Sequence, residues 1–202
     1  MSKTTKIIAF ILIVLILDQT LKIWIKTHMM LGQEYMILGE WFRLHFIENN
    51  GMAFGMEFAG KAGKMILSIF RILAVIGIGW YLNHLIQKNE SFGLIISIAA
   101  IFAGALGNII DSAFYGIIFN DSYFQVAKMF PEEGGYASFL HGRVVDMFYF
   151  PIIRGTYPEW FPWKGGQNFI FFRPVFNIAD SAITLGVASI LIFQKRFFAH
   201  HD

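Results

Sequence analysis

Two aspartates that lie far apart in the sequence could hydrolyse a peptide bond together. Asp146 lies in the apolar stretch from Gly142 to Phe148, and Asp180 lies near the start of a later apolar run. Two carboxyl groups that share a site do not both ionise easily, so one keeps a proton while the other is charged. The charged group can then activate a water molecule while the protonated group polarises a carbonyl. Alone, Asp146 would more often be a turn or surface carboxylate, so the hypothesis depends on its pairing with Asp180.

Two segments have the form Asn-x-x-Asp, and the second of them includes Asp180. They pair Asn108 with Asp111 and Asn177 with Asp180. Positions three residues apart lie on one face of a helix, so each pair can present an amide and a carboxyl group to the same neighbour. The alternative interpretation is that these side chains only cap helix ends or hold helices together.

Other catalytic chemistries have weaker support in the sequence. Ser181 has no histidine near it in the sequence, which leaves a dyad with Lys22 as the remaining way to activate it. The six histidines lack the spacing of a zinc motif. The chain has no cysteine, which excludes disulfides, thiolate zinc sites and a cysteine nucleophile. We therefore expect no catalytic metal and no cofactor.

The elements that position these side chains are predicted to be membrane-spanning helices. Of the 202 residues, 56% are hydrophobic and 15% are charged, whereas soluble domains usually carry about 25% charged residues. A spanning helix needs roughly 20 mostly apolar residues. Four segments qualify, at about 6–25, 64–85, 92–114 and 175–194. The net charge of +2 and the lack of a basic run in the sequence argue against nucleic-acid binding.

The order of the four helices brings the polar groups within them to one side of the membrane. Consecutive spans alternate in direction, so the end of the first, the start of the second, the end of the third and the start of the fourth share a face. The polar residues near that face are Asp18, Lys22, Arg71, Asn108, Asp111, Asn177 and Asp180. Ionisable groups within a span are costly and usually face a bundle interior or a watery cavity. We therefore expect them to form one site.

Such a cluster has two other interpretations. Intramembrane acids and bases also suit a small proton-coupled transporter, and polar residues can simply hold the helices of an assembly subunit together. Asp146 distinguishes these possibilities, because a proton relay needs no loop carboxylate paired with one on the fourth helix.

Basic residues indicate how the chain is oriented. Both termini and the short loop at 87–91 are predicted to lie on the face opposite the polar cluster, with Lys3, Lys6, Lys88, Lys195 and Arg196. By the positive-inside rule that face is cytoplasmic. The first helix resembles a secretory signal, but no small-x-small cleavage site follows it, so we expect it to be retained.

Two long connections, at about 26–63 and 115–174, remain outside the predicted helices. Residues 41–46 alternate weakly as a strand would. The second connection is rich in aromatic residues, Gly and Pro, which suits strands and turns at a membrane–water boundary. Within it, residues 116–141 contain Gly134-Gly135 as a possible hinge, and we expect this segment to be a mobile flap over the site.

Five segments, in order along nearly the whole chain, resemble those of the lipoprotein signal peptidases (signal peptidase II). They are Asp18-Gln19-x-x-Lys22, Asn49-Asn50-Gly51-Met52-Ala53-Phe54-Gly55, Gly104-Ala105-Leu106-Gly107-Asn108-Ile109-Ile110-Asp111, Val144-Val145-Asp146-Met147-Phe148 and Phe176-Asn177-Ile178-Ala179-Asp180. The resemblance implies a single domain over residues 1–202: an all-α membrane bundle of four transmembrane helices with a small extracytoplasmic β-cradle. It also implies an aspartic endopeptidase of the bacterial inner membrane, with Asp146 and Asp180 as the catalytic pair.

The resemblance further implies the substrate and its contacts. The expected substrate is a diacylglyceryl-modified prolipoprotein, cut just before its lipidated cysteine, with the lipid chains lying between helices in the bilayer. Positions that shape the site or contact substrate in the family are matched by Asn49, Gly51, Asn108, Asp111 and Asn177, and a supporting position in the first helix is matched by Asp18 and Lys22. No cofactor is implied, and we expect a monomer.

The sequence departs from the family's pattern in two places. The family usually has arginine directly after the aspartate of the third-helix motif, where this chain has Ser112, and the segment from 112 to 142 is longer than usual. Arg143 or Arg71 could replace the missing cation near the acidic cluster. We expect Arg143 to do so, because it lies three residues before Asp146, whereas Arg71 has the alternative of extending toward the outer surface.

Overall fold

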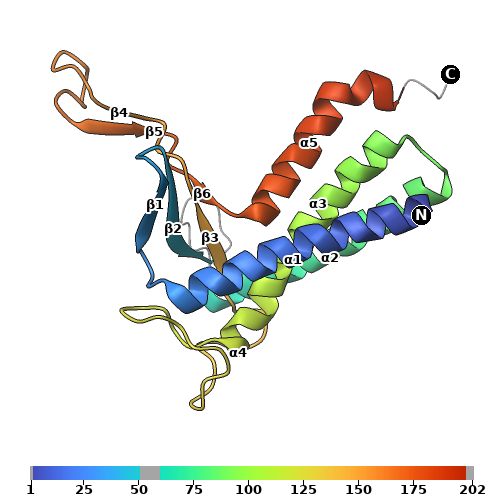
Figure 1. Ribbon diagram of the computed structural model, residues 1–202, viewed down its shortest axis with the longest axis horizontal. Helices are drawn as coiled ribbons and strands as arrows, with labels where there is room; N and C mark the ends of the chain where they lie inside the picture. Colours follow the sequence, from blue (N-terminus) through green and yellow to red (C-terminus); the bar gives the residue numbers. More distant parts are fainter. Residues whose placement is uncertain (1, 51–59, 199–202) are drawn as a thin grey trace.

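The structure, a computed structural model, describes residues 2–50 and 60–198, and it consists of a helical bundle with a small sheet at one end (Figure 1). In these two ranges, four helices are long and apolar enough to span a membrane, over Lys3–His28, Gly63–Gln87, Phe92–Ile118 and Ile178–Phe197. They correspond to α1 (Lys3–His28), α2 (Gly60–Gln87), α3 (Phe92–Ile110) with its extension, and α5 (Ile178–Phe197). The prediction of four long apolar helices is confirmed.

Polar side chains and a change of helix type set the ends of these helices. Ser2 and Ser91 cap the first turns of α1 and α3 by accepting backbone N–H groups. After Ile110, α3 continues as a π-helical turn (Asp111–Tyr115) and the short α4 (Gly116–Ile118). The last helix begins at Ile178 rather than near 175, because Val175 and Phe176 form a strand instead.

Within the described residues, six short strands form two antiparallel sheets beside the bundle. The larger sheet has the order β1-β2-β3-β6, and its strands are β1 (Glu34–Leu38), β2 (Phe42–Asn49), β3 (Val144–Tyr149) and β6 (Val175–Phe176). The weak alternation at 41–46 thus correctly predicted a strand. The smaller sheet is a hairpin of β4 (Ile153–Thr156) and β5 (Asn168–Phe171).

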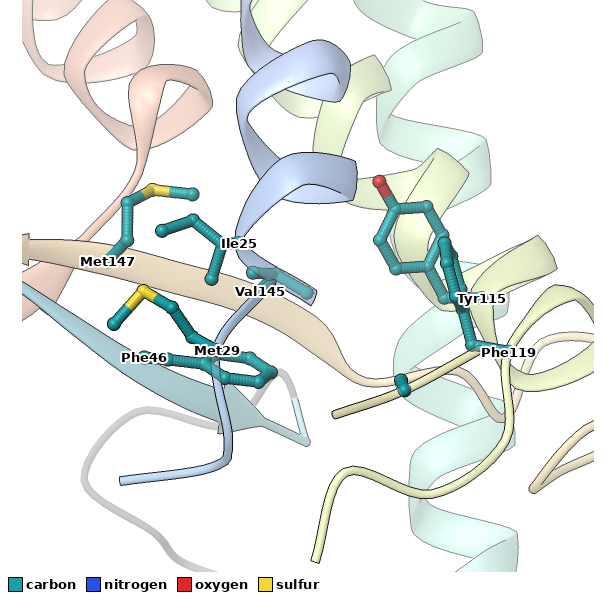
Figure 2. Close-up of a cluster of buried hydrophobic side chains, with 8 residues drawn as sticks. Ile25, Met29, Phe46, Tyr115, Phe119, Val145 and Met147 are labelled. Carbon is teal, nitrogen blue, oxygen red and sulfur yellow. The ribbon is translucent and has the colours of Figure 1, made fainter. Parts of the chain in front are cut away.

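A buried apolar cluster joins the larger sheet to the ends of α1 and α3 (Figure 2). Its members are Ile25, Met29, Phe46, Tyr115, Phe119, Ala127, Val145 and Met147. Successive side chains of a strand point to opposite faces. Because Val145 and Met147 point into this cluster, Asp146 between them points to the other face of β3.

Glycine allows α3 and α5 to approach closely beside this sheet. A Cβ atom added at Gly104 would lie 2.2 Å from the backbone oxygen of Ala179, too close for any side chain. The small residue therefore brings the start of α5 against α3, and Asp180 comes with it.

The segment at 116–141, which the sequence suggested to be a mobile flap, is docked against the end of α1. The Ala127 N–H donates to the carbonyl oxygen of Lys26, and the Leu31 N–H donates to that of Ser122. Ser122 and Ala127 are both buried in this contact. Residues 122–127 are thus held against α1 through pairings with distant residues that the composition of the segment did not reveal, and its movement as a flap over the site stays a prediction.

Candidate active site

Asn177 connects the two aspartates on which the chemical hypothesis rests. Asp146 comes from β3, and Asp180 comes from the first turn of α5. The Asn177 Nδ2 atom donates to Asp146 Oδ1 over 2.8 Å, and its Oδ1 atom accepts the backbone N–H of Asp180 over 2.8 Å. Asn177 is thus both the cap of α5 and the link between the two acids, so capping and site formation are one role here.

A second amide holds the Asp180 carboxyl group. Asn108 on α3 donates through Nδ2 to Asp180 Oδ1 over 2.8 Å. Its own oxygen accepts from Lys22 Nζ over 2.9 Å and from Asn177 Nδ2 over 3.1 Å. Both Asn-x-x-Asp motifs therefore meet at one point, as the sequence predicted. Asn49 of β2 reaches the same point and lies 3.4 Å from Asp146 Oδ2.

A buried ion-pair network of residues on α1 and just after α3 lies next to these amides. Lys22 Nζ lies 2.9 Å from Asp18 Oδ2 and 2.8 Å from Asp111 Oδ2. The other oxygen of Asp18 accepts the backbone N–H of Ala179, and Asp111 accepts that of Val145. Each acid thus holds a residue directly beside one aspartate of the pair. A buried charge is tolerated when it is paired and hydrogen-bonded in this way.

Gln19 is a supporting residue to which the sequence gave no role. Its amide nitrogen donates to Asp111 Oδ1 over 2.9 Å and to Asp18 Oδ2 over 3.1 Å. Its position inside the motif Asp18-Gln19-x-x-Lys22 was the available signal. In the described part of the chain, every buried side-chain nitrogen and oxygen has a hydrogen-bond partner, so the network is complete there.

The environment of Asp146 favours its protonated form. Burial, and then the nearby negative charge of Asp180, raise the pKa of the Asp146 carboxyl group from 3.8 to about 7. Lys22 and the hydrogen bonds from Asn49 and Asn177 act in the opposite direction. A carboxyl group with a pKa near neutrality can hold or release a proton near neutral pH.

Arg71 is the arginine that lies beside this pair. A cavity of about 210 Å³ opens between α2, α3 and α5, and Arg71, Asn108 and Asp180 line it together with apolar side chains. The Arg71 guanidinium interacts electrostatically with Asp180 and, more weakly, with Asp146. Ser112, at the position where the family usually has arginine, is buried and donates to the Asn108 carbonyl oxygen over 3.0 Å.

Arg143 points elsewhere, contrary to the expectation from its position in the sequence. Its guanidinium lies 2.8 Å from Glu48 Oε2 and 3.4 Å from Asp121 Oδ2. Residues three apart in an extended chain project to opposite faces, so proximity to Asp146 in sequence turns Arg143 away from it.

The group around Arg143 is a second buried charge network that the sequence did not reveal. Lys26 of α1 is fully buried and pairs with Glu48, and it also donates to Ser122 Oγ over 2.9 Å. Because Glu48 precedes Asn49 and Arg143 precedes β3, this network fixes both strands against α1. Gly51, the remaining predicted site residue, lies outside the described residues.

Comparison with known proteins identifies the family. The family model described as signal peptidase (SPase) II matches residues 10–196. The lipoprotein signal peptidase of Porphyromonas gingivalis is 48% identical over 189 residues, which cover 93% of this chain and 82% of that protein. The lipoprotein signal peptidase of Amoebophilus asiaticus is 37% identical over 197 residues, which cover 96% of this chain and 79% of that protein.

Solved structures share the fold. A bacterial membrane enzyme determined at 2.3 Å resolution matches with a TM-score of 0.61 and 24% identity, over 98% of this chain and 92% of that one. Another, determined at 1.9 Å resolution, matches with a TM-score of 0.60 and 26% identity, over 94% of this chain and 92% of that one. The match of the family model over nearly the whole length, together with these relatives, shows that the chain belongs to the signal peptidase II family.

Proposed function

We propose that Asp146 and Asp180 are the catalytic pair of an aspartic mechanism in this membrane-bound protease. The observation that carries the proposal is the hydrogen-bonded bridge through Asn177 and Asn108, which holds two carboxyl groups from different elements at one point. The raised pKa of Asp146 supports it further, because a pair that keeps one proton at neutral pH contains both an acid and a base.

The reaction is attack by water on the carbonyl carbon of the scissile bond. The ionised carboxylate takes a proton from the water while the protonated carboxyl group donates its proton to the carbonyl oxygen. When the tetrahedral intermediate collapses, the C–N bond breaks and the leaving nitrogen receives a proton. The proton titrates between the two acids as a pair, so neither is assigned permanently as acid or base. The products are a free carboxylate and a free amine.

The substrate is a lipoprotein, because the family cleaves the signal peptides of lipoproteins. More specifically, we assign the cut to the bond before a diacylglyceryl-modified cysteine. The lipid chains of such a substrate can pack against the apolar surface of the bundle. Many apolar side chains of α2 and α5 are exposed, among them Phe70, Leu73, Leu185 and Ile192.

We assign Arg71 the role of stabilising the negative charge that develops on the substrate carbonyl oxygen. A guanidinium in the cavity beside Asp180 can donate to the carbonyl oxygen as it becomes negative. The guanidinium also interacts electrostatically with both aspartates. Arg143 contributes differently, by fixing β3 against Glu48.

The site is assigned to the outer side of the membrane, with both termini in the cytoplasm. The basic residues near the termini and at 88 favour this orientation. Reporter fusions at residue 89 and at the C-terminus are expected to report cytoplasm, and a fusion near residue 160 the outer side. A cytoplasmic signal from the fusion near 160 would separate the site from an exported substrate.

The function is tested by cleavage of a lipidated prolipoprotein across a range of pH. We expect cleavage to decline as pH rises through about 7, because above the pKa of Asp146 the pair no longer holds the proton that it must donate. Asn177→Ala removes a hydrogen bond that favours ionised Asp146, so the alkaline limb should move to higher pH. The measurement is the pH profile of kcat/KM for both proteins.

The control substrate is the same prolipoprotein without its lipid, which should remain uncut. Enzyme held at the highest pH and returned to pH 6 should recover full activity, which separates titration from unfolding. A rate that keeps rising through pH 9 would contradict the aspartic mechanism. Equal cleavage of the unlipidated protein would contradict the substrate assignment alone.

A further inference from the structure

The β4–β5 hairpin is a separate sheet, and an exposed ion pair links it to the larger one, with Arg154 Nη1 3.6 Å from Glu40 Oε2 in the turn between β1 and β2. The two strands pair antiparallel from Ile153 with Phe171 to Thr156 with Asn168, and among the described strands they form a sheet of their own. Figure 1 shows the hairpin projecting from the end of the larger sheet, clear of the helices. An isolated two-stranded hairpin is marginally stable in water, so the hairpin needs a partner surface.

The tip of the hairpin holds its own shape. The Tyr157 ring lies 4.9 Å from the ring of Phe161 and 4.9 Å from that of Phe169, and the Lys164 ammonium lies 5.9 Å from the Tyr157 ring centre. The Trp160 ring lies 6.1 Å from that of Phe161, and Trp160 and Trp163 are 79% and 97% exposed. Two tryptophans held outward on a formed tip are placed for contact with a surface rather than for the protein's own core.

The composition of the hairpin fits a lipid headgroup layer. Seven of the 22 residues from 152 to 173 are aromatic, about twice the proportion in the whole chain. The cationic residues are Lys164, Arg173 and Arg154, the last of which pairs with Glu40, against the single acidic residue Glu159. Tryptophan and tyrosine concentrate at the membrane–water boundary, and lysine and arginine are attracted there by anionic headgroups.

In the sequence, the hairpin lies just before the last membrane span and between the elements that carry Asp146 and Asp180. Arg173 lies five residues before Ile178, where the last span begins. The hairpin is the connection from β3, which carries Asp146, to α5, which carries Asp180. We propose that it is a bilayer anchor, with Trp160 and Trp163 inserted among anionic lipid headgroups beside α5.

The test uses the absence of cysteine from the sequence, which makes one introduced cysteine the only labelling site. Pro162→Cys, between the two tryptophans, is labelled with a fluorophore in nanodiscs of phosphatidylethanolamine and phosphatidylglycerol. We expect strong quenching by lipids with a nitroxide near the headgroup and weak quenching by aqueous iodide. Adding Trp160→Ala and Trp163→Ala should move the label into water. Lys164→Gln should lower the ratio of lipid-protected to water-exposed label about fivefold.

The matched control is the same fluorophore at Glu133→Cys, an exposed position in an acidic turn of the 116–141 segment. There we expect the opposite pattern, with strong iodide quenching. Equal iodide access at 162 and 133 would overturn the anchor. So would protection of the label at 162 that appears only after a lipidated prolipoprotein is added, since the hairpin would then contact substrate. Cleavage measured on the same samples is independent, so loss of the anchor leaves the proposed chemistry standing.

Discussion

Asp146→Asn and Asp180→Asn should each reduce cleavage of a lipidated prolipoprotein by several orders of magnitude. Removing a general acid or base costs about 10²–10⁴ in rate, and in a coupled pair the remaining carboxyl group cannot serve both purposes. The amide keeps the shape of the carboxyl group and can still accept from Asn177 or Asn108. The measurement is kcat with purified protein in detergent.

Both variants should remain folded and inserted in the membrane. Asp146 is buried, so a neutral side chain there avoids the cost of desolvating a charge. The thermal unfolding temperature of the Asp146→Asn variant should therefore not fall far below that of the wild type. Turnover near the wild-type rate in either variant would end the aspartic interpretation. If either variant does not fold, the same measurement is made on Asp146→Glu and Asp180→Glu, which keep the carboxyl group but move it.

Asp121→Asn is the matched control for these two substitutions. It removes a carboxylate from the same end of the molecule, where Asp121 is partly exposed and pairs with Arg143 at 3.4 Å. Partly exposed ion pairs contribute little to stability. The Asp121 carboxylate accepts from the Tyr123 N–H and pairs with Arg143, away from Asp146 and Asp180. Its kcat should stay close to that of the wild type.

Arg71→Gln should lower kcat about 10²-fold, the cost of removing one donor to a developing oxyanion. Arg71 lines the cavity beside Asp180, and glutamine keeps a donor but loses the charge and the forked geometry. Binding of the lipid portion of the substrate should be little affected, so KM should change less than kcat. Arg71→Lys should retain more activity than Arg71→Gln, because the charge is preserved.

Arg143→Gln provides the comparison, because it removes the same charge from the other candidate position. The substitution keeps the ion pair between Lys26 and Glu48 but removes the one between Arg143 and Glu48, which holds the start of β3. We expect a lower unfolding temperature and a smaller loss in kcat than for Arg71→Gln. The reverse ranking of the two kcat values would assign the missing cation to Arg143 after all.

The sequence alone determined the features that depend on short stretches of chain. Length and hydropathy are local properties, so four apolar segments predicted four helices, and the alternation of direction placed Asn108, Asp111, Asn177 and Asp180 on one side. The ordered motifs predicted the family, which the comparisons confirmed. The function followed from that family.

The tertiary structure decided which polar groups meet. Arg143 follows the alternation of an extended strand and pairs with Glu48, while Arg71, distant in sequence, lies beside Asp180. The 116–141 segment contacts Lys26 near the end of α1 and Leu31 just after it, and no local pattern encodes these contacts.

Asn177 shows the division most clearly. The Asn-x-x-Asp spacing predicted that Asn177 lies within a helix and faces a neighbouring helix. Instead Asn177 caps α5, because Val175 and Phe176 pair with β3 and the helix begins only at Ile178. Only that delay turns its amide toward Asp146. Such a contact joins residues 31 positions apart, and its free energy comes from packing two distant segments together, which a pattern of neighbouring residues cannot specify.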